Sequence, residues 1–75
     1  MEKTAIIDLR GLECPEPVFH TIKLLRKGRV KPGVRILVEQ RQCAILIAAA
    51  VEAHFAGEAN VKIIEEDSNY VVIVE

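Results

Sequence analysis

The stretch Gly11-Leu12-Glu13-Cys14-Pro15-Glu16-Pro17 separates two secondary-structure elements of the chain. Residues 4–9 before it form a short run rich in β-branched side chains, which is typical of a strand, and Gly11 ends this run. From Pro15 onward apolar residues recur at helical spacing until Gly28, namely Val18, Phe19, Ile22 and Leu25. The stretch therefore predicts a strand followed by a helix, with a cysteine at the junction.

The chain then repeats this order. Pro32-Gly33 is a turn, residues 34–39 alternate like a second strand, and residues 43–56 are expected to form a second helix closed by a glycine. Strands that alternate with helices favour parallel pairing of the first two strands. If both helices lie on one face of the sheet, they begin at the same end, and Cys14 and Cys43 become neighbours.

The C-terminal part predicts a hairpin. Residues 60–66 and 70–75 are expected to form two strands joined by the turn Asp67-Ser68-Asn69. The predicted fold is therefore a single α+β domain over residues 1–75. It is a two-layer sandwich of order βαβαββ, with a four-stranded mixed sheet and two helices on one face.

Composition limits the chemistry and the location. The chain has 75 residues, of which 51% are hydrophobic and 28% charged, as in an ordinary soluble domain. A domain of this size buries only about 60% of its unfolded surface, which favours surface-borne chemistry over a deep active site. Because the chain has neither an apolar run of roughly 18 residues nor a signal-peptide pattern, we expect a cytoplasmic protein without membrane contact. Two cysteines are too few for a secreted disulfide scaffold, so both are expected to be thiols.

Charge is unevenly distributed along the chain. Residues 1–37 carry eight Lys or Arg and four Asp or Glu, a net charge of +4, whereas residues 38–75 carry two and seven, a net charge of −5. The basic excess lies at the end of the first helix, in Lys23, Arg26, Lys27, Arg29 and Lys31. Either these bases contact phosphate or an acidic protein partner, or, as we favour, they complement the helix dipole and stay solvated. Because the three aromatic residues are not interleaved with these bases, no direct nucleic-acid readout is expected.

The second predicted helix is unusually apolar. Residues 43–51 contain no charge, and a helix that is hydrophobic all round normally needs cover all round. Either this helix forms a homodimer contact, or its alanines Ala48, Ala49 and Ala50 are tolerated at the surface.

Two prolines restrict the backbone around Cys14. With Cys14 as the N-cap, Pro15 occupies the first helical position and Pro17 removes a further donor. The N–H groups of Glu16 and Val18 then remain as donors near a partly exposed thiol. The positive end of the helix favours a thiolate by roughly 0.3–1 kcal/mol.

The residues around Cys14 exclude several classes of reaction for its thiol. Arg10 is expected to support the thiolate, whereas Glu13 and Glu16 oppose it. A local dithiol is excluded because Pro17 stands where a Cys-x-x-Cys motif needs its second cysteine. Neither histidine is placed as a catalytic base, and His20, His54 and the cysteines lack the spacing of a zinc site, so we expect neither a metal nor a cofactor. The remaining chemistry is that of a thiol that accepts a chemical group and transfers it to another molecule.

The run Leu9-Arg10-Gly11-Leu12-Glu13-Cys14-Pro15-Glu16-Pro17 resembles the signature of the TusA/SirA family of small sulfur-carrier proteins. The likeness covers about 38 residues, including Lys31-Pro32-Gly33; beyond them, residues 38–44 lack the family's Asp-Asp-Pro segment, and Gly57-Glu58 replaces its Gly-His. The resemblance implies a βαβαββ sandwich in which Cys14 accepts sulfane sulfur as a persulfide. The donor would be a cysteine desulfurase or a rhodanese-like protein.

The same resemblance implies relay to an acceptor protein, for tRNA thiolation, cofactor biosynthesis or sulfur metabolism. Such a protein is a carrier, or sulfurtransferase-like, rather than a stand-alone enzyme. Residues of the motif around Cys14 are then the expected partner-binding residues: Arg10, Gly11, Glu13, Pro15, Glu16 and Pro17.

Cys43 has two interpretations. It is either a small apolar residue at the start of a buried helix or a resolving thiol. A resolving thiol attacks a Cys14 persulfide or sulfenic acid, releases the sulfur and forms an intramolecular disulfide, which requires a Cα separation within about 7 Å. Two further classes stay open: a thiol-redox protein that cycles both cysteines, and a non-catalytic regulatory module that binds a partner near the second helix.

Overall fold

The computed structural model describes residues 5–75; Thr4, predicted at the edge of the first strand, lies outside them. The elements follow the predicted order βαβαββ. They are β1 (Ala5–Asp8), α1 (Glu16–Arg26), β2 (Val34–Val38), α2 (Arg41–Phe55), β3 (Val61–Glu66) and β4 (Asn69–Val74).

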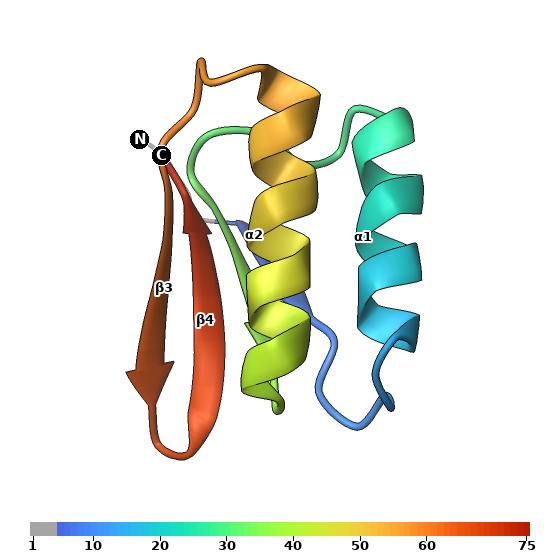
Figure 1. The fold of residues 1–75 in the computed structure, drawn as a ribbon, viewed down its shortest axis with the longest axis vertical. Coiled ribbons are helices and arrows are strands. Elements are labelled where there is room, and N and C mark those ends of the chain that lie inside the picture. Colours follow the sequence, from blue (N-terminus) through green and yellow to red (C-terminus); the bar gives the residue numbers. More distant parts are fainter. Residues whose placement is uncertain (1–4) are drawn as a thin grey trace.

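The four strands form one mixed sheet in the order β1-β2-β4-β3. β1 pairs in parallel with β2, as predicted, and the other two pairings are antiparallel. Both helices cover the same face of this sheet and run in the same direction (Figure 1). The predicted α+β two-layer sandwich is therefore confirmed.

The core lies between α2 and the sheet. In β2 the alternate residues Val34, Ile36 and Val38 are buried, because their side chains share the face that the helices cover. Ile47 and Val51 of α2 are fully buried against the same layer. Burial of one face of β2 accounts for the alternating pattern of this strand in the sequence.

The β3–β4 hairpin has a tighter turn than predicted. Its turn consists of Asp67 and Ser68, with φ values of 51° and 66°, which is the left-handed pair of a two-residue type I′ turn. Asn69 was expected in the turn but pairs with Glu66 in the ladder. A two-residue turn prevails because its twist matches that of the strands it joins.

Both helices begin at other residues than predicted. Pro15, and not Cys14, is the N-cap of α1, so Pro17 is the second helical residue. α2 begins at Arg41, because the Ala44 N–H donates to the Gln40 carbonyl at 3.1 Å. Each cysteine therefore stays near a helix start but sits in a different position relative to it.

The buried side of α1 differs in part from the predicted apolar set. Leu25 is buried as expected, but Phe19 is 57% exposed. Pro17 and Thr21 are buried instead, and the Thr21 hydroxyl donates to the Pro17 carbonyl at 2.9 Å. A threonine contributes to this contact face because that bond satisfies its hydroxyl within the helix.

One side of α2 is apolar and uncovered. Ile45 and Leu46 are 49% and 43% exposed, whereas Ala48 is buried. Of the alanines expected to be tolerated at the surface, Ala49 is exposed. A homodimer through this side stays a prediction.

The two isoleucines of α2 give a matched test of this packing. Ile47→Ala removes a fully buried side chain and should lower the free energy of unfolding by about 2–5 kcal/mol in urea titrations. Ile45→Ala, the same change at an exposed position, should cost less than about 1 kcal/mol. Equal losses in the two variants would contradict the assignment of the buried side of α2.

Candidate thiol site

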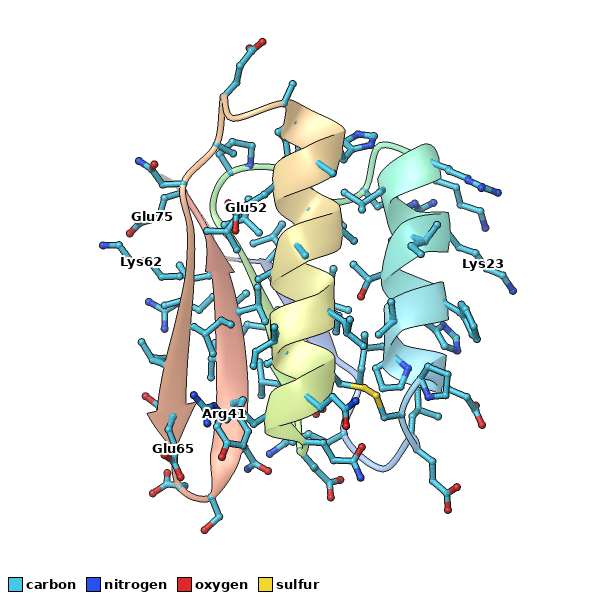
Figure 2. The ribbon with its side chains drawn as sticks, viewed as in Figure 1. Lys23, Arg41, Glu52, Lys62, Glu65 and Glu75 are labelled. Atoms are coloured by element: carbon cyan, nitrogen blue, oxygen red, sulfur yellow. A yellow bond between two sulfur atoms is a disulfide. The ribbon has the colours of Figure 1, made fainter. Side chains whose placement is uncertain are left out.

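The topology brings the two cysteines together. Because β1 and β2 are parallel neighbours, the loops that leave their carboxyl ends meet at one edge of the sheet. Cys14 follows the end of β1 at Asp8 by six residues, and Cys43 follows the end of β2 at Val38 by five. Figure 2 shows the yellow bond between their sulfur atoms at the shared end of the two helices.

Cys14 and Cys43 form a disulfide, with Cα atoms 5.9 Å apart. This separation lies within the usual disulfide range of roughly 4.4–6.8 Å and meets the condition set for a resolving thiol. The expectation that both cysteines are thiols is wrong for this state of the molecule. A count of cysteines carries no information on their distance, which the parallel strands determine.

The two sulfur atoms differ in exposure. Cys43 is 1% exposed and lies among the residues that α2 buries, as the apolar interpretation predicts. Cys14 is partly exposed, and Glu13, Pro15 and Glu16 around it are exposed. Solvent therefore reaches the pair from the Cys14 side.

A hydrogen bond between the two loops fixes the loop that carries Cys14. The Gly11 N–H donates to the carboxylate of Glu39, which follows β2. Gly11 has a φ of +90°, a conformation that strains any residue with a side chain. Glu39 was not among the predicted site residues, because the two partners lie 28 positions apart and no local pattern marks them.

The first turn of α1 offers the Cys14 thiol no free donor. The Glu16 N–H donates to the Glu13 carbonyl at 2.7 Å, and the Val18 N–H donates to the Pro15 carbonyl at 3.0 Å. The predicted role of these two N–H groups beside the thiol is therefore wrong. The physical reason is that α1 begins one residue later than predicted, so the carbonyls of Glu13 and Pro15 accept the hydrogen bonds of these two N–H groups.

Arg10 binds Asp8 instead of supporting the thiol. Its Nε and Nη2 donate to the two carboxylate oxygens of Asp8 at 2.8 Å and 2.7 Å. The hydrogen bonds from the Arg10 side chain and backbone lower the pKa of Asp8 from 3.8 to about 2. The sequence signal for this pairing is a pair of opposite charges two residues apart. The bidentate fit of guanidinium to carboxylate favours it.

The two histidines and the basic residues near the end of α1 lie at the surface. His20 and His54 are exposed, and no group of His, Cys, Asp or Glu able to hold a metal occurs within residues 5–75. A surface hollow of about 430 Å³ is lined in part by Lys27, Arg29 and Lys31, beyond the C-terminal end of α1. The length of α1, roughly 16 Å, separates this basic hollow from Cys14.

Among the described residues, no helix is both long and apolar enough to cross a membrane. Comparisons with protein-family models, curated proteins and solved structures find no match to the chain. The site is thus defined by its own geometry: a partly exposed cysteine in a constrained loop, bonded to a buried cysteine.

Removal of the Arg10 guanidinium tests the Asp8 pairing. In Arg10→Ala the pKa of Asp8 should rise from about 2 toward 3.8, measured by NMR titration of its side-chain carboxyl carbon. Because the folded pKa is lowered, the pair stabilises the fold above pH ~4, and this stabilisation is lost as the pH falls toward 2. Lys62→Ala, which breaks the other surface pair (Lys62 with Glu75, 3.3 Å), should leave Asp8 unchanged. An Asp8 pKa that is the same with and without Arg10 would refute the assignment.

Proposed function

We propose that this protein is a sulfur carrier that holds sulfane sulfur as a persulfide on Cys14 and relays it to an acceptor protein. The observation that carries the proposal is the partial exposure of Cys14, which lies in a loop that the Gly11–Glu39 bond holds and just before Pro15 and Pro17. A persulfide needs a nucleophilic thiol to form and an accessible terminal sulfur to leave. In the reduced form Cys14 presents its thiol at a partly exposed position, from which a terminal sulfur can leave toward a partner.

The rigidity of the loop suits this role. A carrier presents one sulfur atom to two different proteins, and a preformed loop reduces the entropy lost in each encounter. Pro17 is buried and anchors the first turn of α1, while Glu13, Pro15 and Glu16 form the exposed surface beside the thiol. We propose these exposed residues as the surface that donor and acceptor proteins share.

The resemblance to the TusA/SirA family supports the same role. The βαβαββ sandwich is the fold that the resemblance implies, and Cys14 is the residue to which it assigns the persulfide. The donor class in this proposal is a cysteine desulfurase or a rhodanese-like protein, and the location is the cytoplasm. In that setting the Cys14–Cys43 disulfide must be reduced before sulfur is loaded.

A second candidate is a thiol-redox protein that cycles between the Cys14–Cys43 disulfide and the dithiol. The disulfide itself is the observation that favours it. This candidate needs no sulfur donor, and it predicts that oxidation removes two hydrogens from the protein without the addition of sulfur.

Intact-protein mass after incubation with a cysteine desulfurase and cysteine separates these candidates. Reduced Cys43→Ala should gain one sulfur atom, because its Cys14 thiol is present and has no partner to displace the sulfur. Treatment with a dithiol should remove that atom again. Cys14→Ala, the matched control, should gain none. A Cys43→Ala protein that stays unmodified would contradict the carrier proposal and leave the redox candidate.

A further inference from the structure

The disulfide shows that the Sγ atom of Cys43 reaches the Sγ atom of Cys14 in the folded protein. When Cys14 instead carries a persulfide, its Sγ is bonded to a terminal sulfur. Thiol–disulfide exchange proceeds by attack of a thiolate on a sulfur of an S–S bond. The buried Cys43 and the partly exposed Cys14 place the attacking group inside the protein and the terminal sulfur toward solvent.

The start of α2 favours an anion at Cys43. The first intrahelical bond is donated by Ala44, so the N–H groups of Arg41, Gln42 and Cys43 precede it. The N-cap Gln40 makes no side-chain bond to them, and the first turn contains no acidic residue. Free N–H groups at a helix start stabilise negative charge. The Arg41 side chain does not contribute, because it points away from the disulfide, toward Glu65 and Tyr70 (Figure 2). The burial of Cys43 acts in the opposite direction.

The first turn of α1 is arranged differently. Its N–H groups are removed by proline or bonded to the carbonyls of Glu13 and Pro15. The two helix starts therefore act unequally on the two sulfur atoms. Cys43 has helix-start N–H groups that favour its thiolate and Cys14 has none, whereas Cys14 has the partial exposure that a loaded sulfur requires.

We propose that the protein has a second activity, in which Cys43 discharges the persulfide of Cys14 as hydrosulfide. This inference rests on the proposed function, because it requires a persulfide on Cys14. The thiolate of Cys43 attacks Sγ of Cys14, the Cys43–Cys14 bond forms, and the bond to the terminal sulfur breaks. The electron pair leaves with that sulfur as HS⁻. The terminal sulfur is reduced, and the two cysteines are oxidised to the disulfide.

The product of this step is the disulfide that the structure contains. A dithiol reductant, the co-reactant of the cycle, returns both cysteines to thiols for another round. An acceptor protein must take the terminal sulfur before Cys43 attacks. Cys43 thus determines whether sulfur leaves as a relayed atom or as free sulfide.

A defined persulfide donor tests the discharge step. Reduced wild-type protein, freed of reductant under anaerobic conditions, is mixed with one equivalent of glutathione persulfide, and released sulfide and intact mass are followed. The wild type should release sulfide and lose two hydrogens. Cys43→Ala and Cys43→Ser should retain the added sulfur atom and lose the protein-dependent sulfide release. Cys14→Ser should neither retain sulfur nor release sulfide.

The outcomes distinguish the two proposals. Sulfur retained equally by the wild type and by Cys43→Ala would overturn the discharge activity and leave the carrier role intact. No sulfur on either Cys43 variant would contradict the carrier role, and the discharge would fail with it. Sulfide release by Cys14→Ser at the wild-type level would also overturn the proposal, because Cys43 would then react with the donor directly. A retained sulfur atom shows that Cys14 is reactive in the Cys43 variants, so their folding and reactivity need no separate test.

Discussion

The parallel pairing of β1 with β2 determines where both cysteines lie. Each strand runs to the same edge of the sheet and is followed by a helix, so Cys14 and Cys43 meet although 29 residues separate them. Closing a loop of that length restricts the unfolded chain and contributes about 3.5 kcal/mol to stability in the chain-entropy model. That is a large share of the 5–15 kcal/mol typical of a domain. The reduced form, which sulfur chemistry requires, is therefore also the less stable form.

The unequal surroundings of the two cysteines follow from the elements that carry them. Cys14 lies in a loop outside α1, whereas Cys43 lies inside the first turn of α2, the helix that packs on the sheet. A loop residue is exposed to other proteins, and a residue on the buried side of a central helix is not. The Gly11–Glu39 bond joins the loop to the residues just before α2, so a partly exposed cysteine and a buried one stay within reach of each other.

Local patterns in the sequence predicted every element and its order, because apolar spacing and glycine breaks are local signals. They also predicted that the cysteines lie at one end of the sheet. Three features were not predicted. They are the pairing of Arg10 with Asp8, the Gly11–Glu39 bond, and the hydrogen bonds that occupy the N–H groups of Glu16 and Val18. The Gly11–Glu39 bond depends on tertiary structure. The occupied N–H groups depend on a helix start displaced by one residue, which the spacing of apolar residues does not resolve. The expectation of two thiols was wrong, and a disulfide was foreseen only as the product of a resolving step, since Cα distance is a property of the folded chain.

The central claim is that Cys14 and Cys43 of one chain are bonded partners. Peptide mapping under non-reducing conditions, after mild oxidation and blocking of free thiols, tests it most directly. Trypsin cleaves after Arg10, Lys23, Arg41 and Lys62, which places the cysteines in separate peptides, residues 11–23 and 42–62. We expect these two peptides to be joined by a disulfide in monomeric protein. Blocked thiols on both peptides, or a bond between the Cys14 residues of two chains, would contradict it.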